Sequence, residues 1–315
     1  MKVSVAIPIY NSESTIGNVV DSLVETLTSH YSLEIVLVND ASPDHSEDVC
    51  FKICEKYPSI VKFYSLAKNV GEHNAVMAAL NHTTGDYVVI MDDDFQNPIS
   101  EVVKLFEYIR NSDYDVVYTY YEKKQHSYFR NLGSRFNDRV ANVMLQKPKD
   151  LYLSSFKVLS HFLVREIIKY DLPFPYIDGL ILRTTSKIGK LKVLHEKRAE
   201  GKSGYTLRKL VRLWMNMFIN FSILPLRISV IIGFIFAIFG FGLGIYAVID
   251  KLTNPTLPLG YTTIAVMVAI FAGIQLIAIG VVGEYLGRMF LSQNKRPQYC
   301  IRKKTEPTEN KCLSE

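Results

Sequence analysis

Three adjacent aspartates, Asp92 to Asp94, follow an apolar run and are the most distinctive group of chemically active side chains in the sequence. Neighbouring carboxylates repel one another, so such a cluster is costly unless a cation or a solvated turn relieves the charge. Along an extended backbone, Asp92, Asp94 and Gln96 point to one side and Asp93 to the other. Oxygen ligands of this kind suit Mg²⁺ or Mn²⁺ bound together with a diphosphate. We predict that Asp92 and Asp94 bind one divalent ion and its ligand, on the side that Gln96 continues; a solvated acidic turn is the alternative.

Polar residues also end two earlier apolar runs. Tyr10 and Asn11 follow residues 3–9, and Asn39 and Asp40 follow residues 34–38. Strand-like runs alternate with segments of helical spacing, which predicts an α/β fold with a mostly parallel, doubly wound sheet. In such a sheet ligands bind beyond the carboxyl ends of the strands, where these three polar clusters fall. The predicted strands cover residues 3–9, 34–38, 61–66, 87–91, 116–121 and 154–160, and the predicted helices residues 12–27, 48–56, 71–80, 100–111, 127–145 and 163–170.

Two segments near the C-terminus, residues 228–249 and 262–283, contain no charged residue. Each is long enough to cross a hydrocarbon core, which needs about 20 residues. Basic residues lie before the first segment and after the second, whereas the short loop between them has a single lysine. This asymmetry predicts two transmembrane helices with both flanks in the cytoplasm. A buried helical hairpin of a soluble protein is the alternative.

The sequence therefore predicts four parts in chain order. Residues 1–200 form a cytoplasmic catalytic domain, since no secretory signal peptide precedes the first strand. Residues 201–226 form an amphipathic interfacial helix, residues 227–288 the two-helix transmembrane region, and residues 289–315 a cytoplasmic tail. The formal net charge of +5 is concentrated beside the apolar segments. That placement favours a membrane surface or a phosphate ligand over nucleic acid.

Three motifs, at residues 5–11, 38–42 and 92–98, resemble those of family 2 glycosyltransferases with the GT-A (Rossmann-like) fold. Within that family the chain is similar to the polyisoprenyl-phosphate glycosyltransferases, typified by dolichol-phosphate mannose synthase. Residues 283–288 and 296–299 resemble the C-terminal signature of bacterial members with two spans, the bactoprenol glucosyltransferases and the undecaprenyl-phosphate formamido-arabinose transferases. The resemblance implies a multi-pass protein of the inner (cytoplasmic) membrane. It also implies a nucleotide-sugar donor, with UDP favoured, a polyprenyl phosphate acceptor, and a homo-oligomer of the tetrameric kind found among relatives.

The resemblance also assigns residues to the donor. Asp92, Asp94 and Gln96 match the family's metal- and diphosphate-binding triplet, and Asp40 would contact the base. The full set implied for nucleotide-sugar binding is Pro8, Tyr10, Asn11, Asp40, Lys68, Asn69, Gly71 and Asp93. Residues 176–179 are candidates for part of the sugar pocket, and His73 either caps a helix or touches the diphosphate.

A second set is implied for the lipid phosphate: Arg130, Ser134, Arg135, Arg198, Lys202 and Ser203. Solvated faces or contacts with lipid headgroups are the alternatives for these basic residues. Many relatives carry a Gly-Asp-Phe near the acceptor, and Ser154, Ser155 and Phe156 match it here, so no carboxylate is implied at that point. An ionised phosphate monoester is itself a nucleophile and needs little help from a general base.

Two other functions remain open at this point. A processive polysaccharide synthase would share the front half of the chain but needs more spans and a Gln-x-x-Arg-Trp type motif. The single tryptophan, Trp214, lies outside such a motif. A catalytically silent, nucleotide-sugar-binding membrane protein is the third reading. We expect an inverting, metal-dependent transfer of one sugar to a polyprenyl phosphate.

Overall fold

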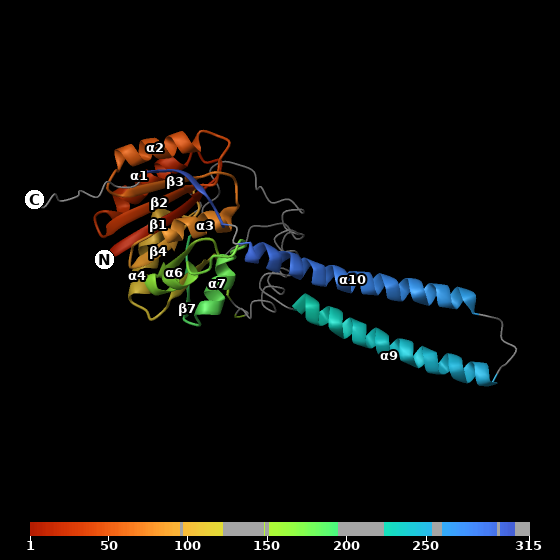
Figure 1. Cartoon of the computed structure of the whole chain (residues 1–315). Coiled ribbons are helices and arrows are strands. Elements are labelled where there is room, and N and C mark those ends of the chain that lie inside the picture. The colour runs from red at the N-terminus through yellow and green to blue at the C-terminus, as the bar shows by residue number, and fades with distance from the viewer. Residues whose placement is uncertain are drawn as a thin grey trace, which may run out of the picture. The chain divides into compact units, whose positions relative to one another are not determined.

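The computed structural model describes residues 1–94, 97–121, 148, 151–194, 224–253, 260–294 and 297–305. The chain divides into two compact units (Figure 1). The first unit combines Met1–Tyr205 with Arg296–Glu315, so the C-terminal segment returns to it. The second unit is Thr206–Lys295. The predicted helix at residues 127–145 lies outside the described residues, as do residues 201–223 of the predicted interfacial helix.

The first unit is built on one eight-stranded sheet with the order β7-β5-β6-β4-β1-β2-β3-β8. Strands β1 to β5 and β7 run in one direction, and β6 and β8 run antiparallel to their neighbours. The prediction of a mostly parallel α/β sheet is therefore confirmed. The strands are β1 (Lys2–Ile9), β2 (Ser32–Asn39), β3 (Val61–Leu66), β4 (Tyr87–Ile90), β5 (Val116–Tyr120), β6 (Lys157–Ser160), β7 (Ile188–Lys192) and β8 (Ile301–Thr305).

The central strands are buried on both faces and are rich in β-branched residues, as expected for a parallel sheet covered by helices. In α1 the apolar residues recur at helical spacing and all point into the core, from Ile16 to Leu27. Helices α1, α2 and α4 cover one face, and α3, α6 and α7 contact the strands or one another on the other. The helices of this unit are α1 (Ile16–Leu27), α2 (Ser46–Lys56), α3 (Glu72–Asn81), α4 (Ile99–Arg110), α6 (His161–Ile167) and α7 (Ile177–Thr184).

Two elements were not predicted, α7 and the edge strand β7. β7 reads Ile-Gly-Lys-Leu-Lys, too short and too polar on one face to stand out from a loop. Its Gly189 is required by packing, because a Cβ there would lie 2.6 Å from the Tyr114 ring. The sequence is also strand-like at residues 298–302, and the strand found there, β8, begins at Ile301 and pairs with β3 of the same chain.

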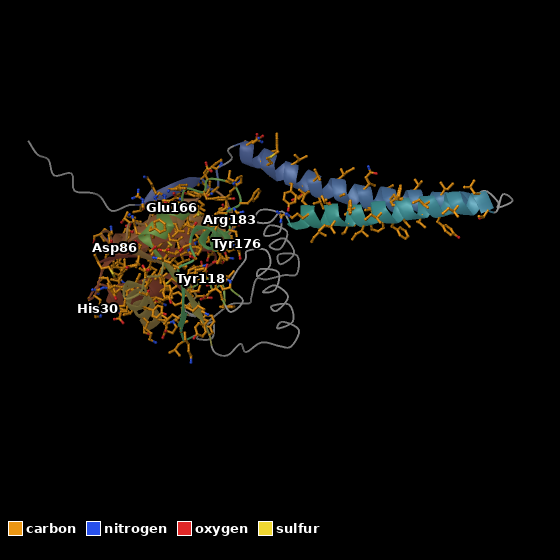
Figure 2. The ribbon with its side chains drawn as sticks, turned by 90° about the horizontal axis from the view of Figure 1, so that it is seen from below. His30, Asp86, Tyr118, Glu166, Tyr176 and Arg183 are labelled. Atoms are coloured by element: carbon orange, nitrogen blue, oxygen red, sulfur yellow. The ribbon has the colours of Figure 1, made fainter. Side chains whose placement is uncertain are left out.

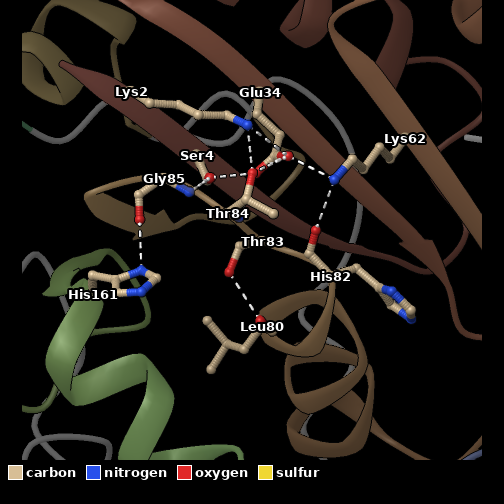
Figure 3. Close-up of polar contacts among 10 residues, drawn as sticks. All are labelled: Lys2, Ser4, Glu34, Lys62, Leu80, His82, Thr83, Thr84, Gly85 and His161. Carbon is tan, nitrogen blue, oxygen red and sulfur yellow. Dashed lines mark hydrogen bonds and ion pairs between the residues drawn. The ribbon is translucent and has the colours of Figure 1, made fainter. Parts of the chain in front are cut away.

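At the amino edge of the sheet a buried carboxylate ties three strands together (Figure 3). Glu34, 4% exposed, accepts hydrogen bonds from Ser4 and Thr84 and forms an ion pair with Lys62 at 2.7 Å. Desolvation alone would raise the pKa of Glu34, but the hydrogen bonds from Lys62, Ser4 and Thr84 outweigh it and lower that pKa. Gly85 passes so close to Ser4 that a Cβ there would lie 2.7 Å from the Ser4 nitrogen.

The second unit contains two long helices, α9 (Leu224–Thr253) and α10 (Tyr261–Gln293), which pack side by side (Figure 1). Their large apolar side chains project outward, for example Phe241 at 74% and Leu276 at 69% exposure (Figure 2). The parts long and apolar enough to cross a membrane are Leu226–Tyr246 and Ile270–Leu291, by length and composition. At 1.5 Å per residue, the 33 residues of α10 extend about 50 Å, beyond a hydrocarbon core of about 30 Å.

Candidate active site

The candidate site lies at the carboxyl edge of the sheet, where β1, β2 and β4 end. These three strands are parallel neighbours, so Tyr10, Asp40 and Asp92 follow strand ends at the same edge. Strand β6 is antiparallel to β4 and therefore begins at this edge rather than ending there. The order of the strands thus brings a fourth segment, residues 154–156, to the same place.

Asp92 is oriented by Ser155. The β4–β6 register pairs Ile90 with Lys157, and continuing it by two residues sets Asp92 opposite Ser155. The Ser155 hydroxyl donates to Asp92 Oδ2 at 2.6 Å, and both residues are partly exposed. The stretch whose sequence lacks the family's carboxylate therefore supplies a hydrogen-bond donor to the first aspartate of the cluster.

Asp93 is held from the other side of β4. It accepts a hydrogen bond from the hydroxyl of Ser12, which follows β1. Burial raises the pKa of Asp93 to about 6, against the lowering effect of the Ser12 bond, and the neighbouring charge of Asp92 adds to the rise. Asp92 and Asp93 are thus bound to different flanking segments, so their carboxylates are not interchangeable in the site.

Asp40 organises the loop before α3. Its two carboxylate oxygens accept backbone N–H bonds from Val70 at 2.7 Å and Gly71 at 2.9 Å, and its carbonyl accepts from the Asn69 side chain at 3.2 Å. Burial raises the pKa of Asp40, while the two backbone bonds oppose that rise. Gly71 has φ +91°, a conformation that favours glycine, and α3 starts directly after it. Hydrogen bonds therefore hold Asp40, Asn69 and Gly71 together at this edge of the sheet.

The remaining donor candidates lie around the end of β1 and the same loop. Tyr10, Asn11 and Lys68 are exposed, and Pro8 is half-buried. Asn11 adopts φ +58°, a left-handed conformation that is uncommon outside glycine. Its backbone N–H donates to Ser42 Oγ at 3.2 Å, which links the end of β1 to the turn after β2.

Glu72 and His73 open α3 and face this acidic region. Glu72 is exposed to solvent yet closely surrounded by protein, and the resulting desolvation, followed by the charge of Asp92, raises its pKa to about 7. Burial lowers the pKa of His73 to about 4, so its ring is neutral at physiological pH. The His73 ring packs edge-on against Tyr176, with ring centroids 5.0 Å apart, and Tyr176 lies beside α7 in Figure 2. Sequence reasoning singled out His73 but missed Glu72.

A buried ion pair joins β6 to α7. Lys157, 4% exposed, contacts the carboxylate of Asp178, 8% exposed, and the Tyr118 hydroxyl donates to the same oxygen at 2.8 Å. The Lys157 ammonium also lies 5.0 Å from the centre of the Tyr118 ring. Asp178, in the stretch considered for the sugar pocket, is thus engaged with protein. A lone lysine within the apolar stretch Phe156–Leu159 was the available signal for this pair.

Among the described residues, no group of three or more His, Cys, Asp or Glu side chains is arranged to hold a metal ion by itself. Mg²⁺ and Mn²⁺ commonly take one or two carboxylates and complete their coordination with substrate phosphate and water, so Asp92 and Asp94 fit such an ion. Gln96 lies outside the described residues, as do the six candidates for the lipid phosphate: Arg130, Ser134, Arg135, Arg198, Lys202 and Ser203.

Comparison with known proteins follows this division of the chain. Residues 4–168 match the model of glycosyl transferase family 2, and residues 224–289 match the model described as the GtrB C-terminal hairpin. The chain is 32% identical to an undecaprenyl-phosphate 4-deoxy-4-formamido-L-arabinose transferase of Serratia proteamaculans, covering 96% of this chain and 93% of that protein. The protein of the same name from Yersinia enterocolitica is 31% identical over 98% and 96% of the two chains.

Solved structures share the sheet unit. A glucosyl-3-phosphoglycerate synthase of Mycobacterium tuberculosis superposes with a TM-score of 0.52 at 19% identity, covering 70% of this chain and 80% of that one. The same enzyme with Mn²⁺, UDP and phosphoglyceric acid superposes with a TM-score of 0.51 at 19% identity, over 68% and 75% of the chains. At this identity the likeness establishes the fold, and the predicted GT-A architecture is confirmed.

Proposed function

The chain belongs to glycosyl transferase family 2, as its motifs predicted, and we propose that it transfers one monosaccharide from a nucleotide-sugar to a polyprenyl phosphate. The observation that carries this proposal is similarity over nearly the whole chain, apolar hairpin included, to transferases named for undecaprenyl phosphate. The proposed acceptor is undecaprenyl phosphate and the proposed donor a UDP-sugar. A solved relative in fold binds UDP and Mn²⁺, which supports both the nucleotide and the ion.

The proposed metal ligands are Asp92, Asp94 and Gln96. A bound divalent ion would neutralise the diphosphate leaving group. Ser155 restricts the rotation of Asp92 through its hydrogen bond, and Ser12 keeps Asp93 turned toward β1. This division supports Asp92 and Asp94 as ligands and leaves Asp93 as a neighbour that adds negative charge.

The acceptor would act without a carboxylate base at residues 154–156. One phosphate oxygen of the lipid attacks the anomeric carbon from the face opposite the leaving group, the bond to the nucleoside diphosphate breaks, and the configuration inverts. A phosphate monoester is largely ionised at neutral pH, so this oxygen has no proton to lose. What the protein must supply is orientation and positive charge. We assign that role to Arg130, Ser134, Arg135, Arg198, Lys202 and Ser203, by resemblance to the family.

The proposed location is the bacterial inner membrane. Helices α9 and α10 would cross it as a hairpin, with the catalytic unit and both termini in the cytoplasm, because the basic residues flank the hairpin on its open side. We propose a homo-oligomer, with the tetramer of relatives as the expected state.

The decisive experiment is transfer by the full-length protein in lipid nanodiscs. The protein is incubated with undecaprenyl phosphate, Mg²⁺ or Mn²⁺ and a panel of nucleotide-sugars. The mass of the lipid product is then measured by mass spectrometry. We expect one added sugar residue and no polymer. A polymer of many sugars would identify a processive synthase instead, and nucleotide-sugar binding without any lipid product would identify a silent binding protein.

A further inference from the structure

The strand that follows the membrane hairpin is part of the catalytic unit. β8 pairs antiparallel with β3, with Lys303 opposite Ser65. Just before β8, the Cys300 carbonyl accepts the Ala67 backbone N–H at 2.8 Å, next to the loop that carries Lys68, Asn69 and Gly71. The Gln298 side chain donates to the carbonyls of Tyr170 at 2.7 Å and Leu172 at 2.9 Å. The segment 298–305 is therefore tied to this unit at three separate points.

Lys303 begins a chain of polar contacts that leads inward. Its ammonium donates to Glu47 Oε1 at 2.5 Å, and Glu47 lies in the first turn of α2. The second oxygen of Glu47 accepts from the hydroxyl of Ser65, 1% exposed. The Ser65 oxygen in turn accepts from the Asn39 side-chain amide at 3.3 Å. Asn39, the last residue of β2, is also 1% exposed.

The chain continues from Asn39 to the candidate donor residues. Asn39 Oδ1 accepts from the hydroxyl of Ser42 at 2.6 Å and from its backbone N–H at 3.1 Å. The Ser42 oxygen accepts the backbone N–H of Asn11 at 3.2 Å. Every hydroxyl along this path has one proton to give and uses it once, so all the bonds can exist together. A lysine after the membrane hairpin is thus connected to the turn at the end of β1.

The two turns at the end of this path are conformationally unusual. Among the described residues other than glycine, φ is positive only at Asn11, with 58°, and Ala41, with 51°. Left-handed backbone at such residues persists only where the surroundings hold it. Ser42 contacts both turns, because it accepts from Asn11 and directly follows Ala41. Asp40, which organises the loop before α3, lies between Asn39 and Ala41.

We propose that Lys303 is a positioning residue for the nucleotide-sugar donor, acting through Glu47, Ser65 and Asn39 on the turns at Asn11 and Asp40. This inference rests on the proposed function, because it assumes that those turns bind the nucleotide. Lys303 touches no substrate in this arrangement. It keeps the Glu47 carboxylate turned toward Ser65. The hydrogen bonds that follow then hold the Ser65 and Asn39 side chains in the orientation that the turns require.

The ion pair itself contributes little to stability. The Lys303 and Glu47 side chains are 52% and 27% exposed, and exposed pairs of this kind are screened by water and salt. Removal of Lys303 should therefore leave the melting temperature nearly unchanged. Its effect should appear in the geometry of the donor turns. A purely structural role of β8 as a charged edge strand predicts no effect on the donor.

The test compares Lys303→Met with Lys56→Met in the full-length protein. Lys56, on α2, forms an exposed ion pair with Asp21 at 2.8 Å. Its replacement therefore removes one positive charge, as Lys303→Met does, without touching the path. With UDP and Mn²⁺ as the probe, we expect Lys303→Met to weaken binding about fivefold to tenfold, because the turns that bind the nucleotide lose the support of this path. The KM for the donor should rise in parallel, kcat should stay within about twofold, and Lys303→Arg should restore binding. Equal UDP affinity in Lys303→Met and Lys56→Met would overturn the proposal.

Amide hydrogen exchange without nucleotide separates this inference from the proposed function. Exchange at residues 11 and 42 should accelerate in Lys303→Met and in Glu47→Gln, and the double variant should add little, because both changes break one path. Unchanged exchange at these amides would refute the path whatever the protein binds. A wild-type protein that binds no nucleotide would refute the proposed function and, with it, the role assigned to Lys303.

Discussion

Ser155, two residues before β6, donates its hydroxyl to Oδ2 of Asp92, two residues after β4, at 2.6 Å. This bond limits the rotation of the Asp92 carboxylate. A ligand carboxylate that is already oriented loses less freedom when it binds a cation. The hydroxyl thus supports the acidic cluster from the segment before β6, which is far away in the sequence.

Ser155→Ala is expected to raise the Mn²⁺ concentration needed for half-maximal transfer by about fivefold, because Asp92 loses its orienting donor. Titration of activity with Mn²⁺ measures the effect. Ser154→Ala is the matched control: Ser154 is buried and bonds to Thr119 at 3.0 Å, so its loss should lower stability and leave the Mn²⁺ dependence unchanged. The same Mn²⁺ shift in both variants would argue against an orienting role for Ser155.

Replacing Asp92 and Asp94 together by Asn should reduce transfer by at least about a thousandfold, because the proposed metal ligands lose their charge. The protein should remain folded, since neither side chain belongs to the apolar core. Transfer assays and circular dichroism check the two expectations. Asp113→Asn, at a side chain 93% exposed, is the control for charge alone. Full activity in the double variant would disprove the assigned metal site.

Lys157→Met should lower the melting temperature by about 10 °C, because it leaves the buried carboxylate of Asp178 without its cation, a loss of about 3–5 kcal/mol. Adding Asp178→Asn should recover part of that loss, since Tyr118 can still donate to the amide oxygen. Thermal unfolding of the single and double variants measures this coupling. Lys187→Met, at an exposed pair with Asp113, should shift the melting temperature by less than about 2 °C.

Glu34 should make stability depend on pH in the acid range. Its folded pKa is lowered below the usual 4.5, so ionised Glu34 stabilises the fold fully above about pH 4.5 and this stabilisation disappears as the pH falls through the folded value. Glu34→Gln should be less stable than the wild type at pH 7, and the difference should shrink below pH 4.5. Melting curves across this range test the sign. Glu25→Gln, at an exposed position on α1, is the control and should change the stability at pH 7 by less than about 0.5 kcal/mol.

Much of the fold followed from local patterns along the chain. The apolar runs at β1 to β4 and the helical spacing of α1 predicted their elements closely, because each pattern reflects burial on a fixed period. The two apolar helices were evident because charge-free segments of that length have few other uses. Strand β7 and helix α7 were not predicted, since elements of five and eight residues carry too little periodic signal.

The sequence by itself identified which residue types gather at the candidate site: aspartates after β4, Asp40 after β2 and the polar turn after β1. These could be predicted because parallel strands share one carboxyl edge, so chain order alone brings their ends together. The partners of those residues were decided by tertiary structure alone. Ser155 meets Asp92 only because β6 runs antiparallel, and Lys303 reaches Glu47 only because β8 pairs with β3. Strand direction and register depend on contacts between distant segments, and no local pattern in the sequence specifies them.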